Sequence, residues 1–158
     1  MPSLSHLADF PARPRRLPDV LLNVPGDPVP QGSKIPFRRR NGTIGLREAN
    51  KMHGAWREVI ALHAKAYRAH HWGQLPLDGP LVASMLFTLW PPSKVMKGAA
   101  NATGLPAVVP DLSKLIRCVE DSLSKVLIHD DARIVAFHDT GKVYGDDPGV
   151  LIKLWKLK

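Results

Sequence analysis

Residues 110–134 read PDLSKLIRCVEDSLSKVLIHDDARI, and this stretch decides the fold because a helical pattern runs directly into a strand pattern. Apolar residues recur at three- and four-residue intervals, which predicts a helix over 111–127 with one buried face. Pro110 followed by Asp111 is a favourable helix start. The sequence ARIVAFH at 132–138 is typical of a strand.

The rest of the chain adds strands and one more helix around this unit. Asn41-Gly42 separates two extended pieces and predicts a type I′ hairpin turn. The composition of residues 93–110 is that of a surface loop. The composition of residues 141–148 is that of a turn-rich connection. The other predicted elements are strands at 20–24, 81–90 and 149–156, the hairpin at 35–47 and a helix at 52–71. This order predicts an α+β fold.

The length of 158 residues suits one domain, predicted over 20–158, with a flexible N-terminal arm over 1–19. The single cysteine, Cys118, excludes a disulfide framework and a cysteine-based zinc site. We find neither an apolar run long enough to span a membrane nor a signal-peptide pattern. We therefore expect a cytoplasmic protein that does not bind membranes.

Charge is the first indication of function. The chain has 22 Lys and Arg against 14 Asp and Glu, a net charge of +8. Most of the excess lies in residues 1–72, which hold 12 basic and 5 acidic residues, whereas residues 73–158 hold 10 and 9. A basic surface attracts phosphate backbones. The run Arg38–Arg40 is the strongest candidate for such contacts, although runs of this kind are also ordinary solvated surface.

The acidic residues gather near the long helix of the second half. Asp111 stands at its start, and Asp130 and Asp131 stand just before the following strand. Carboxylates and water are the usual ligands of Mg²⁺, and Mg²⁺ next to a basic surface indicates phosphodiester hydrolysis. The helix ends lie roughly 20 Å apart by helical rise. Asp111 and Asp131 therefore meet only if the strand returns along the helix, or if a neighbouring chain contributes one of them.

The same acidic residues also have an ordinary structural interpretation. Asp111 favours a helix N-terminus whatever its function. Asp121 lies four residues after Arg117 and predicts a surface ion pair. Two aspartates before a strand are a common turn composition. Composition and spacing alone leave both interpretations open.

Two parts of the sequence resemble the RusA family of Holliday-junction resolvases, many of which are phage or prophage proteins. The stretch from Pro110 to Leu123, followed by Asp130 to Val135, is similar to the family pattern of an Asp-x-Asp motif at a helix start, an Asp-Ala-Leu-like triplet and an Asp-Asp pair before a strand. The proline-rich segment 25–30 with the basic residues after it, and Ala55-Trp56-Arg57, are similar to the family's first loop and first helix. The likeness covers roughly residues 20–156.

The resemblance implies a small α+β homodimer with a mixed sheet and two main helices. It implies binding of branched DNA and paired nicks at four-way junctions with Mg²⁺ or Mn²⁺ as cofactor. By position, it assigns the metal to Asp111, Asp130 and Asp131, and the family's basic helix residue to Arg117. Lys114 lies on the same polar arc of the predicted helix, and we expect both basic residues to approach the phosphate. We expect the DNA backbone to be contacted by Lys34, Arg38, Arg39, Arg40 and Lys51.

One position departs from the family pattern, because Ser113 stands where the second Asp of Asp-x-Asp is expected. A hydroxyl can contact Mg²⁺ but brings no charge. Asp111 and Asp131 with waters can suffice for Mg²⁺. Two alternatives to an active resolvase therefore stay open: a junction-binding protein with a weakened or inactive metal site, and an accessory factor that acts through a protein partner.

Overall fold

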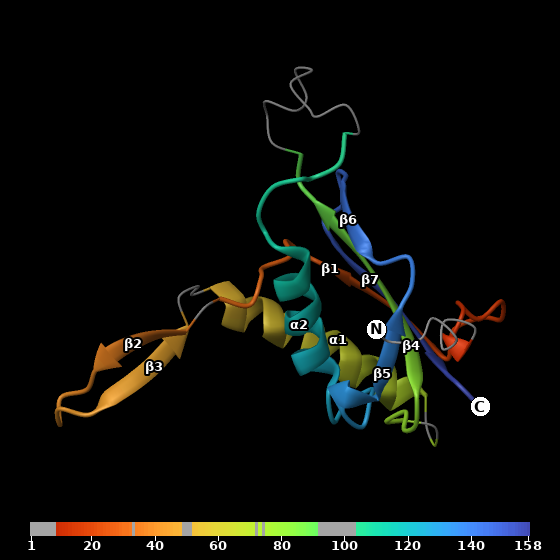
Figure 1. The fold of residues 1–158 in the computed structure, drawn as a ribbon, viewed down its shortest axis with the longest axis horizontal. Helices are drawn as coiled ribbons and strands as arrows, with labels where there is room; N and C mark the ends of the chain where they lie inside the picture. Colours follow the sequence, from red (N-terminus) through yellow and green to blue (C-terminus); the bar gives the residue numbers. More distant parts are fainter. Residues whose placement is uncertain (1–8, 33, 49–51, 72, 74, 92–103) are drawn as a thin grey trace, which may run out of the picture.

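The computed structural model describes residues 9–32, 34–48, 52–71, 73, 75–91 and 104–158. Two helices cover one face of a five-stranded sheet, and a two-stranded hairpin projects from this body (Figure 1). In chain order the elements are β1 (Val20–Pro25), β2 (Lys34–Arg38), β3 (Ile44–Glu48), α1 (Met52–His70), β4 (Leu81–Leu89), α2 (Leu112–Leu123), the 3₁₀ turn η2 (Asp131–Arg133), β5 (Ile134–Phe137), β6 (Gly141–Tyr144) and β7 (Gly149–Lys156). The predicted α+β class is confirmed.

Strand β4 is the centre of the mixed sheet. On one side it pairs antiparallel with β7, which in turn pairs antiparallel with β1. On the other side β4 pairs parallel with β5 near its start and with β6 near its end. Helix α2 therefore connects two parallel neighbours, β4 and β5, as a crossover. It starts beside the end of β4 and returns the chain to the beginning of β4.

The core lies between the sheet and the two helices. Alternating residues of the strands point toward the helices, because successive side chains of a strand point to opposite faces. On the helix side, α1 contributes Trp56, Ile60 and Ala64, and α2 contributes Leu115, Cys118, Val119 and Leu123. The sheet contributes Val20, Leu22, Val24, Leu81, Ala83, Met85, Phe87, Val150, Ile152 and Leu154. This packing holds α2 along the sheet and turns its polar side outward.

The predicted helix over 111–127 is too long. Helix α2 ends at Leu123, and the next residue, Ser124, already has an extended backbone, with φ −59° and ψ 132°. Lys125 then takes a left-handed conformation with φ 67°. The chain reverses in this way so that Leu127 and Ile128 enter the core. The predicted helix runs on to residue 127 because Val126 continues the apolar spacing of the helix.

Two smaller predictions are also wrong. Residues 141–144, expected in a turn-rich connection, form strand β6 because they pair with the end of β4. The hairpin turn is not type I′, since positive φ occurs at Gly42 alone, with a value of 83°, and not at Asn41. The backbone N–H of Gly42 donates to the carbonyl of Arg39 at 2.9 Å. This is the arrangement of a longer loop that closes with a left-handed glycine.

Part of the predicted N-terminal arm contacts the sheet. The indole Nε1 of Trp155 donates to the carbonyl of Arg16 at 3.0 Å, and the Arg16 guanidinium pairs with Asp19 at 2.8 Å. This guanidinium holds the pKa of Asp19 below its ordinary value. Nε2 of His138 lies 2.7 Å from the carbonyl of Pro11. These contacts tie residues 11–19 to the face of the sheet opposite the helices. In the described part of the chain, no helix is long and apolar enough to cross a membrane.

Gly26 fixes where the proline-rich loop leaves β1. Its φ is 130°, and a Cβ added there would lie 2.9 Å from Cζ3 of the buried Trp56 ring. The loop is also tied to α2, because the backbone N–H of Gln31 donates to the carbonyl of Lys114 at 3.2 Å. The path of this loop therefore depends on a glycine at position 26.

We expect Gly26→Ala to destabilise the fold by about 1–3 kcal/mol, because the side chain meets both a positive φ and the Trp56 ring. Chemical denaturation measures the loss. Gly54→Ala is the matched control: Gly54 lies in α1 with no atom within 4 Å of an added Cβ. That substitution should stabilise the protein by roughly 0.5–1 kcal/mol. Equal effects at the two positions would contradict the role given to Gly26.

Candidate functional site

Asp111 occupies the N-cap position of α2 without capping it. Its backbone is extended, with φ −65° and ψ 130°, and its side chain makes no cap hydrogen bond. The backbone carbonyl instead accepts from the N–H groups of Lys114 and Leu115, both at 3.1 Å. The carboxylate forms an ion pair with Lys114, whose Nζ lies 3.5 Å away, and both side chains are about half exposed. A carboxylate in this position is open to a ligand from solvent.

The segment before Asp111 is held by a residue that the sequence analysis did not select. Nζ of Lys142, on β6, donates to the carbonyls of Val108 at 2.6 Å and Pro110 at 2.9 Å. Lys142 thereby positions the start of α2 against the sheet. Its role depends on β6, a strand that the turn-like composition of 141–148 concealed.

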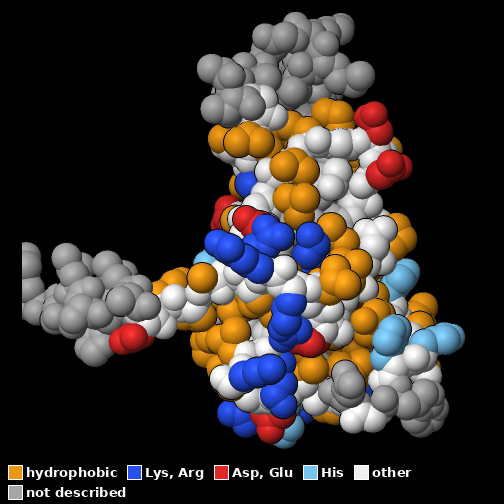
Figure 2. All heavy atoms as spheres, turned by 90° about the vertical axis from the view of Figure 1, so that its right-hand side faces the viewer, with side chains coloured by type: hydrophobic (Ala, Val, Ile, Leu, Met, Phe, Trp, Pro, Cys, Tyr) orange, Lys and Arg blue, Asp and Glu red, His pale blue; other side chains and the backbone are white. Residues whose placement is uncertain are grey.

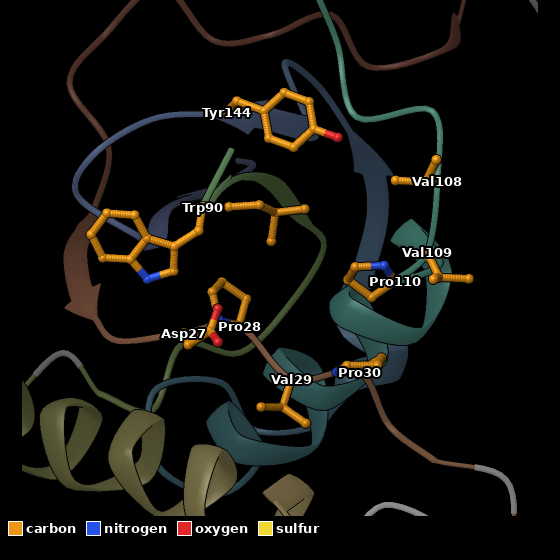
Figure 3. A pocket seen from close by; sticks show the side chains of 10 residues that line it. Asp27, Pro28, Val29, Pro30, Trp90, Val108, Val109, Pro110 and Tyr144 are labelled. Carbon is orange, nitrogen blue, oxygen red and sulfur yellow. The ribbon is translucent and has the colours of Figure 1, made fainter. Parts of the chain in front are cut away.

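A cavity of about 610 Å³ opens next to this end of α2. Figure 3 shows the aromatic rings of Trp90 and Tyr144 on one side of it and Pro110 on the other. The remaining lining comes from Leu89, from Val108 and Val109, and from the proline-rich loop 27–30. Among the described residues that line it, Asp27 alone carries a carboxylate. The cavity is therefore an apolar neighbour of Asp111 and not itself a metal site.

The two adjacent aspartates before β5 have different environments. Oδ1 of Asp130 accepts from the backbone N–H of Ala132 at 3.0 Å, which caps η2, and Oδ2 lies 3.3 Å from Nζ of Lys125. The Ala132 N–H holds the pKa of Asp130 below its ordinary value, and hydrogen bonding to Asp131 and Lys125 adds to the effect. Asp131 is exposed. Asp130 thus already has a structural role, and Asp131 is the more accessible of the pair.

Asp131 lies near the carboxylate of Glu120 on α2, and Asp121 is the next residue of the helix. Burial and, next in size, the negative charges of Asp131 and Asp121 raise the pKa of Glu120 to about 6, while Arg117 opposes them. The predicted ion pair between Arg117 and Asp121 is absent among the described residues. Oδ2 of Asp121 instead accepts from Nε2 of Gln31 at 3.2 Å. Glu120 cannot be selected from the sequence, because its place between apolar helix positions carries no clear signal.

The three predicted metal ligands do not meet within one chain. Helix α2 separates Asp111 from Glu120, the neighbour of Asp131, by nine residues or roughly 13 Å of helical rise. In the parts of the chain that the structure describes, no three His, Cys, Asp or Glu side chains converge to hold a metal ion. Carboxylates are the right donors for a hard divalent cation. The donor chemistry therefore fits Mg²⁺ or Mn²⁺, but a single chain does not gather the donors.

The basic residues proposed for DNA lie mainly on the projecting hairpin. Arg38 ends β2, Arg39 and Arg40 enter the turn, and all three are exposed. Lys34 is the first residue of β2, and Lys51 lies outside the described residues. Figure 2 shows a second gathering of Lys and Arg, down the face of the molecule seen from the right of Figure 1. On α2 itself, Lys114 and Arg117 are exposed.

A comparison with models of protein families identifies the family of this chain. A family model described as "Endodeoxyribonuclease RusA" matches residues 25–155. The chain belongs to the RusA family. A search of curated proteins returns no match to the sequence. The RusA match includes the proline-rich loop, the hairpin, α2 and the Asp130-Asp131 pair, so the resemblance of the sequence is confirmed over most of its predicted extent.

RusA membership gives the acidic surface a functional context, because the family is one of endodeoxyribonucleases that act on branched DNA. The negative charges of Asp121 and Asp131 raise the pKa of Glu120, and holding these carboxylates close together lowers the stability of the fold. Such perturbed groups gather at functional sites. Glu120 offers a direct way to measure this cost.

We expect the stability of the protein to fall as pH rises from about 4.5, the ordinary pKa of Glu120, through about 6, its value in the fold. The reason is that the folded state holds the proton more tightly than the unfolded chain. Glu120→Gln should therefore match the wild type near pH 4 and exceed it at pH 8 by about 1 kcal/mol. A full shift would correspond to roughly 2 kcal/mol, and partial exposure reduces it.

Denaturation at several pH values in metal-free buffer with a chelator measures this difference. Glu58→Gln is the control, since Glu58 is exposed on α1. If the difference in unfolding free energy between Glu120→Gln and the wild type does not change with pH, then burial and the charges of Asp121 and Asp131 do not shift the pKa of Glu120.

Proposed function

We propose that this RusA-family chain is a homodimeric, Mg²⁺- or Mn²⁺-dependent endonuclease that resolves four-way DNA junctions by paired nicks. The observation that carries the proposal is the RusA match over residues 25–155. Two features support it: the exposed carboxylates of Asp111 and Asp131, and the basic hairpin. The rival, a junction-binding protein with a weakened site, is favoured by Ser113 in place of the family's second acid.

In the proposed reaction Asp111, Asp130 and Asp131 would hold the divalent ion, with Asp131 more available than the capped Asp130. When bound, such an ion supplies a nucleophilic water and neutralises charge on the scissile phosphate. Lys114 and Arg117 lie on the exposed side of α2 and would contact the phosphate oxygens. The hairpin arginines would hold the DNA backbone without reading its sequence.

The proposal needs two copies of the chain for two reasons. A four-way junction has two equivalent strands to cut, and a twofold dimer presents two equivalent sites. The distance between Asp111 and Asp131 in one chain gives the second reason. We propose that each site combines Asp111 of one copy with Asp131 of the other.

Asp131→Asn should abolish nicking of a synthetic four-way junction in Mg²⁺ or Mn²⁺ and leave junction binding intact. The substitution removes a ligand charge and keeps the basic surface and the side-chain volume. Gel-based nicking and binding assays on the same protein sample check both parts. If Asp131→Asn cuts at the wild-type rate, the metal-site assignment is wrong.

A mixed dimer tests whether the site is shared. Asp111→Asn and Asp131→Asn should each be inactive alone. A heterodimer of the two, purified through different tags, should regain one intact site and nick one strand without completing resolution. If each site lay within one chain, both sites of the heterodimer would lack a ligand. An inactive heterodimer would therefore contradict the shared site, while leaving the Asp131→Asn result unaffected.

Replacing Arg38, Arg39 and Arg40 by Ala should weaken DNA binding and leave folding intact, because the three side chains are exposed. The slope of log affinity against log salt should flatten by nearly one unit for each lost phosphate contact. Arg57→Ala/Lys65→Ala on α1 is the control, since it removes exposed charge away from the hairpin. An unchanged slope for the hairpin variant would place these residues away from the DNA.

A further inference from the structure

The hairpin β2–β3 carries an apolar face that the body of the protein does not cover. Pro36 pairs with Leu46, and Arg38 pairs with Ile44. Cross-strand partners share a face, and so do alternate residues of one strand, so these four side chains lie together. Ile44 is 74% exposed and Leu46 is 63% exposed. In Figure 1 the hairpin extends away from the sheet and helices.

The opposite face of the hairpin is partly covered by its own side chains. The Phe37 ring packs over Gly45, where an added Cβ would lie 2.8 Å from the ring, and Nε of Arg39 lies against the same glycine. This packing explains why Phe37 is less exposed than Ile44 or Leu46. The uncovered side is therefore the one with Ile44 and Leu46. A two-stranded hairpin has little stability of its own, and a further partner on this face would stabilise it.

The charge of the hairpin indicates the chemistry of that partner. Arg38 lies on the open face beside Ile44, and Arg39 and Arg40 stand at the turn. Between residues 36 and 46 the sequence has no acidic residue. In a twofold contact of hairpin with hairpin, the same patch would meet itself and bring the arginine runs of both copies together. A polyanion suits this surface better than a second copy of the chain does.

We propose that the hairpin is a DNA-inserting arm, in which Ile44 and Leu46 wedge against unstacked base pairs at the branch point while Arg38, Arg39 and Arg40 hold the flanking phosphates. A two-stranded ribbon fits a DNA groove. Apolar side chains such as Ile, Leu and Pro are inserted between base steps by proteins that deform DNA. Unstacking costs a few kcal/mol per step, and a branch point has already interrupted its stacking.

The wedge gives a physical reason for preferring branched DNA over linear duplex. The arginines can bind branched DNA and linear duplex equally well, because they contact only the phosphate backbone. The apolar contacts are favourable only where base pairs open at little cost. This inference rests on the proposed function for its substrate, but it concerns binding and not cleavage.

The test uses Ile44→Thr/Leu46→Thr, which keeps β-forming residues at both positions and removes the apolar surface. Leu62→Ala is the matched control, because Leu62 is 66% exposed on α1. Affinities for a four-way junction and for linear duplex of equal length are measured in buffer with a chelator, so that no cleavage occurs. A junction with 2-aminopurine at the branch point reports unstacking through its fluorescence. Sedimentation gives the oligomeric state.

We expect the double variant to bind the junction about tenfold more weakly and to keep its duplex affinity within about twofold. It should also fail to produce the change in 2-aminopurine fluorescence that reports unstacking when the wild type binds. Equal losses on both substrates, or no loss, would overturn the wedge. If the wild type sediments as a dimer and the double variant as a monomer, the wedge would also be overturned, and this face would be an interface between copies. If wild-type protein shows the expected binding behaviour but never nicks a junction, the proposed nuclease function fails while the wedge stands.

Discussion

The packing of α2 against the sheet and α1 determines where the acidic side chains lie. Its apolar residues, from Leu115 to Leu123, are buried against the sheet and α1, so its polar residues must face solvent. Because β5 pairs parallel with β4, the chain has to return to the start of β4 after α2. Asp111 and Asp131 consequently stand near opposite ends of this helix.

The sequence predicts this architecture well where burial repeats regularly. The apolar stripe of α2 and the mostly apolar sequence of β4 identify both elements, and the strand at 149–156 is found with its observed bounds. The predictions fail where tertiary pairing decides. Val126 continues the apolar spacing of α2, but the chain has already reversed there, and Leu127 and Ile128 are buried after the reversal. Strand β6 exists because the end of β4 offers it a partner.

The candidate site also has one part that the sequence predicts and another that only tertiary packing determines. Asp111 and the Asp130-Asp131 pair can be selected from the family pattern in the sequence. The difference between the two adjacent aspartates cannot, because it depends on the Ala132 N–H and on Lys125. Nor can the participation of Glu120, whose raised pKa depends on burial and on the approach of η2 to α2. Spacing in sequence locates acidic residues along the chain, whereas their charge interactions require the packed structure.

Ser113 adds a physical argument for a site shared between copies. With serine at this position, the first turn of α2 presents only the carboxylate of Asp111, and Lys114 lies 3.5 Å from it. Glu120 and Asp121 are too far along the helix to replace the missing charge, since seven residues span roughly 10 Å. Mg²⁺ is usually held by one or two carboxylates with waters. If two carboxylates hold the ion, the second would come from outside this helix, and in the proposed dimer the exposed Asp131 of the second copy would supply it.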